Sequence, residues 1–483
     1  MKIRIFKRLI ASLLLVAGGG VPAMAQPGDA WDLQRCVDYA LKNNITIRLA
    51  DIQKQSAVID YQQAKASQLP GLNFSTSLGY SSGRNQDPTS FGLITTAYTF
   101  NSMSLQSSMD LFNWFSRKNS VAARELTLEA TSEGVEKARN DIALNVAVAY
   151  LQVLLAREQI KLAEAQAALT RSQLQSTRIQ VDAGKLPEVN AANLESVLAG
   201  DSSALITATT TASQLLLQMK VLLNLDAAAP FDIATPPVDR IPVESLADLQ
   251  PDAVYALAIA NMPQQKVDLL NVKAAERASA AARGMRMPTF SLFGSLGNSY
   301  NNKARQIVSK SVVNAPIGTV TVAGTPYQVF PASPFEVYNY GKIGYMDQLN
   351  QNFRQSIGLG VSVPILNGGS LRSSWQKARL NVRQAELIKE QNSYSLKRDI
   401  YKAYYDAVAA SQKFAADKKT VETTQRTYDF AVKRYEIGLL SSYDLITSQT
   451  NLAKAKSQYL YSQFDYVFKM KLLEFYKGQG IKL

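Results

Sequence analysis

The chain has 483 residues, a net charge of +13, one cysteine and no histidine. A single cysteine excludes an intramolecular disulfide, and a chain without histidine has no histidine-based metal site or acid–base catalyst. The sequence also contains no nucleophile elbow, phosphate-binding loop or cluster of metal ligands. We therefore expect no enzyme activity, no metal site and no cofactor.

Residues 1–25 are expected to be a secretory signal peptide. They begin with four cations, continue as an apolar run to Val16 and end in the A-x-A pattern Ala23-Met24-Ala25. Removing them lowers the net charge from +13 to +9, because Lys2, Arg4, Lys7 and Arg8 are lost. The residue directly after the cleavage point is Gln26 and not a cysteine, so a lipid anchor is not indicated there.

No later run approaches the roughly 18 apolar residues that a membrane-spanning helix requires. An exported chain of this kind either stays in the periplasm or the medium, or spans an outer membrane as a closed barrel of strands. In such a barrel every backbone group is paired, so it needs no apolar helix. The bulk properties leave both alternatives open.

The first half of the mature chain begins with helices and continues with strands. Residues 31–69 carry a helical apolar pattern, which ends near Pro70. From Leu72 to Tyr80 apolar and small polar residues alternate, which predicts a strand. A polar loop is expected over 81–97, followed by a second alternating run from Met103 to Leu111.

Two very long, proline-free helical patterns follow the strands, at 114–183 and 371–437. A helix of that length spans roughly 100 Å, too far to be buried in an ordinary globule. The first has two apolar seams on opposite flanks, one through Val146 and Val153 and one through Val148 and Leu155. Such a helix has a neighbour on each side, as in a ring or sheet of helices.

Two polar faces separate these seams. One is an uncharged column at seven-residue spacing, and the other is charged. The column consists of Asn145, Gln152, Gln159, Gln166, Gln173 and Gln180, and the charged face of Arg157, Glu164, Arg171 and Arg178. A helix that is wet on both remaining sides fits the wall of a tube. The alternative is that both are ordinary solvated faces of a long coiled coil.

The second half repeats this order. A helical stretch runs to Pro288, a strand is expected at 289–298, a long loop at 299–352 and a strand at 353–363. Pro70 and Pro288 are matching positions of the two halves. The spacing between them is shorter than the spacing between positions that match later in the two halves. The second half therefore carries an insertion. It falls in the second loop, where a chain turning in solvent tolerates extra length.

The most informative repeated feature is a glycine turn after each long helix. Residues 178–198 and 432–452 share one register, with Gly184 and Gly438 at the turns. One register held over about a hundred residues indicates duplication. We expect a first repeat over 26–225, a linker or equatorial segment over 226–250, and a second repeat over 251–483.

Several motifs resemble one known family. They are Trp31–Asn44 (WDLQRCVDYALKNN), Leu69-Pro70, the run Pro364–Gly369 (PILNGG), and the two glycine-turn hairpins. In this order they resemble the TolC-type outer-membrane efflux proteins, or outer membrane factors, particularly their Bacteroidetes-like branch. The resemblance covers essentially all of residues 31–477. A single motif of this set is weak, but the order and the duplication are specific.

The resemblance implies a mixed α and β membrane protein. Each chain of a homotrimer would give four strands to a shared twelve-stranded β-barrel in the outer membrane of a Gram-negative bacterium. Its long helices would continue the barrel as an α-helical barrel in the periplasm. The partners would be outer-membrane lipid, a periplasmic adaptor (membrane fusion) protein and an inner-membrane pump. No nucleic-acid partner is implied.

The resemblance also places a site at the glycine turns. The adaptor would dock at a tip formed by Gly184, Lys185, Leu186, Pro187, Gly438, Leu439, Leu440 and Ser441. The pore constriction would be formed by Tyr435, Asp444, Asn190 and Thr447. Leu440 and Thr447 stand where the family has a linking arginine and a second aspartate, so fewer charged links are expected here. Asp444 has an alternative role as a helix N-terminal carboxylate that the helix dipole favours.

We therefore expect a passive exit duct that conducts drugs and other toxic small molecules from a pump to the outside. The first alternative, in the same architecture, is an exit duct for secreted polypeptides. The second is a secreted coiled-coil scaffold or adhesin whose strands form a sandwich. That alternative predicts a detergent-free monomer or dimer, whereas a duct predicts a detergent-dependent trimer in light scattering.

Overall fold

A computed structural model describes residues 30–86, 91–236, 241 and 243–478. The expected signal peptide, residues 1–25, lies outside the described residues. The described chain forms two compact units. Unit 1 runs to Ile52, from Glu133 to Lys266 and from Gln391 onward, and unit 2 comprises Gln53–Ser132 and Val267–Glu390. None of the helices in the described ranges combines the length and hydropathy that crossing a membrane requires.

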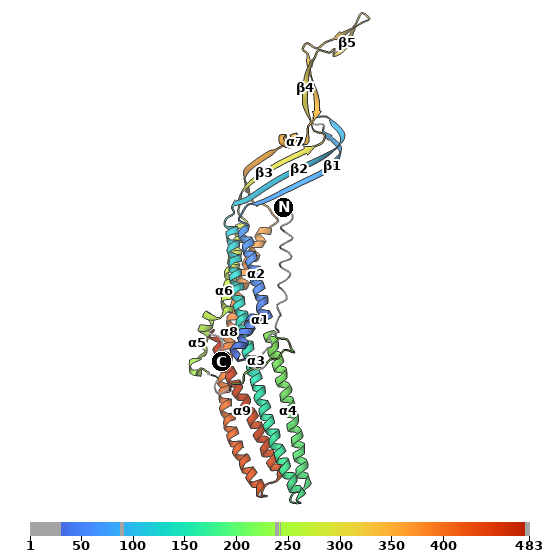
Figure 1. Ribbon diagram of the computed structural model, residues 1–483. Helices are drawn as coiled ribbons and strands as arrows, with labels where there is room; N and C mark the ends of the chain where they lie inside the picture. Colours follow the sequence, from blue (N-terminus) through green and yellow to red (C-terminus); the bar gives the residue numbers. More distant parts are fainter. Residues whose placement is uncertain (1–29, 87–90, 237–240, 242, 479–483) are drawn as a thin grey trace, which may run out of the picture. The chain divides into compact units, whose positions relative to one another are not determined.

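Unit 1 is helical, and its four longest helices run side by side (Figure 1). They are α4 (Glu188–Leu223), α9 (Ser442–Tyr476) and the larger parts of α3 (Ser116–Asp182) and α8 (Ser370–Glu436). The shorter elements are α1 (Leu33–Asn43), α5 (Pro251–Asn261), a 3₁₀ turn at Leu246–Asp248, and the first residues of α2 (Ile45–Ala66) and α6 (Pro263–Gly284).

Two short helices pack against the long ones in the same way. Cys36 and Ala40 of α1 are completely buried in one cluster, and Val254 and Ala258 of α5 are completely buried in a second. The first cluster includes Val146 of α3, and the second includes Ile400, at the matching position of α8. Each short helix thus presents small or β-branched side chains to a long helix, which permits close packing.

The buried thiol of Cys36 gives a direct test of this packing. Burial, with a smaller effect of Asp32, raises the pKa of Cys36 from 9.0 to about 12. We expect no reaction with a maleimide at neutral pH in the native protein and full reaction after unfolding. Because the pKa of Cys36 is higher in the folded state than in the unfolded state, folding favours the neutral thiol. The stability that depends on the neutral thiol is complete below pH 9 and is lost as the pH rises from 9 to about 12. Rapid native labelling would contradict this packing, and Cys36→Ala is the blank.

One of the two predicted seams of α3 is buried within a single chain. Val146 and Val153 are 0% and 1% exposed, whereas Val148 and Leu155 on the other seam are only half-buried. Arg157, predicted on a solvated face, instead donates to the backbone carbonyl of Ile233 at 2.7 Å and pairs with Asp232. Its burial lowers the pKa of the guanidinium. The solvated-face prediction was wrong for Arg157, because the segment after α4 folds back onto the helix.

Unit 2 contains an antiparallel sheet in the order β1-β2-β3-β8. Its strands are β1 (Gly71–Gln86), β2 (Leu93–Phe112), β3 (Thr289–Asn301) and β8 (Arg354–Ser362). The unit also holds the remaining parts of α2, α3, α6 and α8. The first two strands run further than expected into the predicted loop at 81–97.

The two faces of this sheet differ in chemistry. One face presents exposed apolar side chains, including Leu72, Leu78 and Ile357, which are 72%, 80% and 81% exposed. On the other face serine hydroxyls meet across the strands, at 2.7 Å for Ser75 with Ser104, 2.7 Å for Ser77 with Ser102 and 2.8 Å for Ser295 with Ser356. Alternation at period two thus gives one apolar face and one polar face rich in serine.

The long loop predicted at 299–352 is mostly regular structure, so that prediction was wrong. It forms a ribbon that extends beyond the sheet (Figure 1). The elements are β4 (Arg305–Val313), β5 (Gly318–Val322), β6 (Thr325–Val329), β7 (Phe335–Lys342) and α7 (Tyr345–Gln351). Strand β4 pairs with β7, and β5 with β6. Valine and aromatic residues recur between its glycines and prolines, which favours short strands over coil.

The two strand-to-helix junctions share one backbone conformation but differ in sequence. Trp114 and Phe115 have φ of 52° and 60°, and Gly368 and Gly369, at the matching positions of the second half, have φ of 61° and 77°. Aromatic residues are strained in this region. Contacts of Phe112 with both rings, at centroid distances of 5.4 and 5.6 Å, hold them there.

The bounds of the helices match between the two halves. Helices α1 and α5 have 11 residues each, α2 and α6 have 22, and α3 and α8 have 67. The first two pairs keep the sequence spacing of Pro70 and Pro288, and the third keeps the longer spacing of the two glycine turns. The compact units cut across these halves, because each unit takes segments from both. The division of the sequence into a repeat that ends at 225 and a repeat that begins at 251 therefore stays a prediction about how the chain arose by duplication.

Candidate functional site

Both glycine turns of the helical hairpins have the same hydrogen-bond pattern. Gly184 has φ of +70°; its N–H donates to Val181 O at 2.8 Å, and Lys185 N–H donates to Gln180 O at 2.9 Å. Gly438 has φ of +76°, with the equivalent bonds from Gly438 to Tyr435 and from Leu439 to Arg434. This is the Schellman arrangement, in which a left-handed residue satisfies the last helix carbonyls.

The helices that leave the two turns begin differently. Ser441 caps α9: its hydroxyl accepts from Asp444 N–H at 3.1 Å and donates to the Asp444 carboxylate at 2.7 Å. Helix α4 starts after Pro187, which has no side-chain cap. Asp444 therefore lies in the first turn of α9 and is a partner of its cap. That role leaves its charge exposed at the tip.

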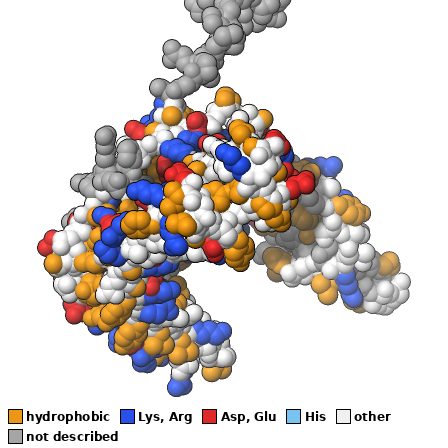
Figure 2. Space-filling view, turned by 90° about the horizontal axis from the view of Figure 1, so that it is seen from below, with side chains coloured by type: hydrophobic (Ala, Val, Ile, Leu, Met, Phe, Trp, Pro, Cys, Tyr) orange, Lys and Arg blue, Asp and Glu red, His pale blue; other side chains and the backbone are white. Residues whose placement is uncertain are grey.

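The hairpin ends expose large apolar side chains. Ile437, Leu439 and Tyr443 of the second hairpin are 69%, 65% and 71% exposed, and Ile179 and Val189 of the first are 65% and 58% exposed. Seen from below, hydrophobic side chains lie among Lys and Arg side chains on the visible face (Figure 2). Exposed apolar side chains gathered at one end of a unit are typical of a protein–protein contact.

The residues predicted to dock a partner fall into two groups. Gly184, Lys185, Pro187, Gly438, Leu439 and Ser441 are exposed, and Leu186 and Leu440 are half-buried. Leu440 packs against the cluster of Tyr428, Ala431, Leu445 and Leu452. Leu440, at the position where the resemblance implies an arginine, thus anchors the turn by apolar contact.

The two hairpins contact each other through neutral polar groups. The Ser442 hydroxyl donates to Asn190 Oδ1 at 2.8 Å, and Gln173 Nε2 donates to the Tyr428 hydroxyl at 3.0 Å. Burial raises the pKa of Tyr428, so its hydroxyl stays protonated. Ile446 of α9 packs against Leu174 and Leu194 of the first hairpin. Asn190 therefore lies at the contact between the two hairpins, and its place in a pore constriction stays a prediction.

A buried chain of hydrogen bonds lies further along the helices. Gln449 Nε2 donates to the Thr170 hydroxyl at 2.9 Å, and the Thr170 hydroxyl donates to Asp201 at 2.6 Å. Thr170 and Gln449 are 0% and 2% exposed. This chain connects α3, α4 and α9, and no periodicity in the sequence singles it out.

Tyr435 lies beside a groove between the two hairpins. The groove has a volume of about 430 Å³ and is lined by Gln173, Thr177 and Gln180 of α3, by Tyr435 of α8 and by Ser442 of α9, among others. Among the described residues the buried Tyr435 hydroxyl has no hydrogen-bond partner, and neither has Gln173 Oε1. Tyr435 therefore lines the groove opposite residues of the first hairpin without a hydrogen bond to them.

Thr447 takes no part in the contact between hairpins. Its hydroxyl donates to the Tyr443 carbonyl of its own helix at 2.8 Å, and the side chain is exposed. Tyr435 and Asn190 thus both lie where the hairpins meet, whereas the hydrogen bonds of Asp444 and Thr447 to described residues stay within the second hairpin. Gln173, Tyr428 and Ser442 complete the contact and were not predicted as constriction residues. Gln173 had a signal, because it belongs to the uncharged column of α3.

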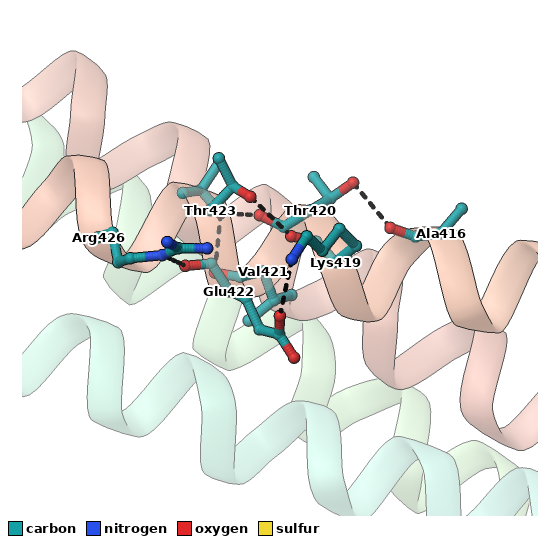
Figure 3. Close-up of polar contacts among 8 residues, drawn as sticks. Ala416, Lys419, Thr420, Val421, Glu422, Thr423 and Arg426 are labelled. Atoms are coloured by element: carbon teal, nitrogen blue, oxygen red, sulfur yellow. Dashed lines mark hydrogen bonds and ion pairs between the residues drawn. The ribbon is translucent and has the colours of Figure 1, made fainter.

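An exposed face of α8 satisfies its own hydrogen bonds. The hydroxyls of Thr420 and Thr423 donate to the carbonyls of Ala416 and Lys419, both at 3.0 Å, and Lys419 pairs with Glu422 at 3.6 Å (Figure 3). Threonine commonly bonds one turn back in this way. Such a face needs no fixed partner. The described residues also contain no group of three or more acidic, Cys or His side chains that could hold a metal ion.

Two substitutions separate the roles of Asp444. Asp444→Ala removes an exposed charge and a cap partner, whereas Ser441→Ala removes only the cap, at a cost of about 1 kcal/mol. If three copies of Asp444 line a pore, Asp444→Ala weakens the cation preference in planar-bilayer recordings and Ser441→Ala does not. Equal ion selectivity of both variants and the wild type would contradict a place for Asp444 in the constriction.

Comparison with known proteins gives a consistent result. The outer membrane efflux protein family matches residues 36–225 and 254–467. The outer membrane efflux protein BepC of Brucella suis is 21% identical over 465 residues, covering 95% of this chain and 88% of BepC. The outer membrane protein TolC of Escherichia coli is 21% identical over 475 residues, covering 95% of this chain and 84% of TolC.

A solved structure gives the same fold. The CmeC outer membrane channel of Campylobacter jejuni superposes with a TM-score of 0.73 at 17% identity, covering 93% of this chain and 86% of CmeC. The mixed helical and strand architecture expected from the sequence is thereby confirmed. At this level of identity the likeness shows the fold alone.

Proposed function

The chain belongs to the outer membrane efflux protein family and is an outer-membrane exit duct, and we propose that it conducts small molecules as a homotrimer coupled to an adaptor and a pump. Members of this family are channel proteins. The observation that carries the proposal is the family match in both halves, together with the exposed apolar side chains at both hairpin tips. The proposed duct is passive, and its partner pump supplies the energy.

The unpaired edges of the sheet support association of copies. Among the described strands β1 and β8 are the two edges of the sheet, and the outer side of each has no strand partner there. Pairing β8 of one copy with β1 of the next closes a symmetric ring without free edges. The exposed apolar face, with Leu72 and Ile357, fits contact with lipid.

The tip supports docking of an adaptor. Leu439 and Tyr443 are more than half exposed and lie next to a turn fixed by Gly438. The neutral contact between Asn190 and Ser442 leaves the hairpins joined by hydrogen bonds that are easier to break than buried ion pairs. We propose that Tyr435, Asn190, Asp444 and Thr447 surround the constriction, and that it widens when these hairpins separate.

A deletion strain tests the choice of cargo. With the gene deleted, a fluorescent hydrophobic dye is expected to accumulate in the cells, and the wild-type gene on a plasmid is expected to restore its export. The negative control is the same plasmid without the gene. Unchanged dye accumulation, with loss of a polypeptide from the medium, would replace small-molecule efflux by polypeptide secretion.

A further inference from the structure

The strand pair β5–β6 has two different faces. Residues opposite each other in an antiparallel pair share a face, so Val320 with Tyr327, and Val322 with Thr325, lie on one side. Thr319 with Gln328, and Thr321 with Pro326, lie on the other. Val320, Val322 and Tyr327 are 48%, 57% and 57% exposed, so the apolar face is uncovered in a single chain.

An isolated pair of strands with an uncovered apolar face is marginally stable in water. The turn at Ala323-Gly324, with φ of 51° and 84°, is of the tight two-residue kind that sets the register of the pair. The turn alone does not provide the burial that three or more strands obtain from packing. A stable β5–β6 pair therefore needs another apolar surface against Val320 and Tyr327.

The charge distribution indicates what supplies that surface. No charged residue lies between Lys310 and Glu336, although the chain as a whole has a net charge of +13. Lys310 and Glu336 pair with each other at 3.0 Å at the base of this segment. A phosphate-bearing lipid headgroup or a charged partner would call for countercharges here. Identical surfaces that meet around a symmetry axis avoid repulsion when they are uncharged.

The position of the ribbon in the chain also indicates that other copies of the chain cover this face. Strands β4–β7 are inserted between β3 and the edge strand β8. Because β8 is the edge that meets the next copy in the proposed trimer, the ribbon emerges next to the seam between copies.

We infer that the β5–β6 pairs of three copies pack against one another through the face that carries Val320, Val322 and Tyr327. The inference rests on the proposed trimer. The contact lies in the segment that distinguishes the second half of the chain from the first, so the first half has no equivalent of it. It joins the copies at a place independent of the sheet edges and of the helices.

Cysteine substitutions on the two faces test this contact. The native Cys36 is fully buried and gives no background. After mild oxidation of intact cells, Val320→Cys and Tyr327→Cys are expected to give disulfide-linked dimers, several-fold more than Thr319→Cys on the opposite face. A polyethylene glycol maleimide is expected to label Thr319→Cys at least several-fold faster than Val320→Cys.

Each other outcome overturns the inference. Equal maleimide labelling on both faces, without disulfides, would show an uncovered face. Protection of Val320→Cys without disulfides at either apolar position would show that lipid or another protein covers it. Light scattering of the purified variants and dye export are measured in parallel. Failure of the trimer itself would appear there, so it is distinguishable from a trimer whose ribbons stay apart.

Discussion

Replacing Lys471 with Met is expected to lower the free energy of unfolding of unit 1 by about 3–5 kcal/mol. Lys471 and Glu474 are 5% and 9% exposed, and their charged groups lie 2.8 Å apart. The Glu474 carboxylate also accepts a hydrogen bond from the backbone N–H of Glu244 at 2.9 Å. Without the ammonium group, that donor is the one the buried carboxylate keeps among the described residues, and it does not compensate for the lost hydration.

A matched control separates burial from ion pairing. Lys419 and Glu422 have the same spacing of three residues along a helix, but their side chains are 71% and 51% exposed. Lys419→Met is expected to change stability by about 0–1 kcal/mol. Guanidinium titrations of both variants in detergent, followed by circular dichroism, measure the difference. Adding Glu474→Gln to Lys471→Met should recover most of the loss. Equal midpoints for Lys471→Met and Lys419→Met would contradict the assigned burial.

Replacing Gly438 with Val is expected to abolish most export while trimers remain in the membrane. No atom lies within 4 Å of a Cβ added at Gly438, so the cost comes from the backbone at φ of +76°. A left-handed conformation costs an ordinary residue about 1–2 kcal/mol, and a β-branched residue tolerates it worst. The turn then takes another conformation and displaces Leu439, which the proposed adaptor contact uses.

Two further substitutions serve as controls for this prediction. Gly200 of α4 is also open to an added Cβ but has no positive φ, so Gly200→Val should preserve export. Gly438→Asn should preserve much of it, because asparagine tolerates the left-handed region. Dye efflux and trimer content of membranes are measured for all three. Loss of trimers in Gly438→Val would mean that Gly438 is needed for assembly, and full export would mean that the turn is not needed for docking.

The helices were predictable because their signals are local. The two proline-free helical patterns, which lie at a constant spacing in the sequence, predicted α3 and α8. A glycine marked each of the two hairpin turns. Alternation gave the four strands of the sheet. The family match adds that these local signals occur in the order of a known fold.

What the sequence did not predict depends on contacts between distant residues. Arg157 is held by the Ile233 carbonyl, 76 positions away, and no pattern near Arg157 signals it. Thr170 and Gln449 are 279 positions apart. The ribbon was missed for another reason. Its glycines and prolines are typical of loops, and its strands are only five residues long at the tip.

Photo-crosslinking at the tip tests the central claim most directly. A benzophenone amino acid replaces Leu439, which is 65% exposed at the turn, or Ile206, which is 68% exposed on α4 away from the turn. After irradiation of intact cells, the Leu439 variant is expected to yield one major adduct, identified by mass spectrometry as a periplasmic adaptor. The Ile206 variant is expected to give no such adduct. Adaptor adducts at Ile206 and none at Leu439 would contradict docking at the hairpin tip.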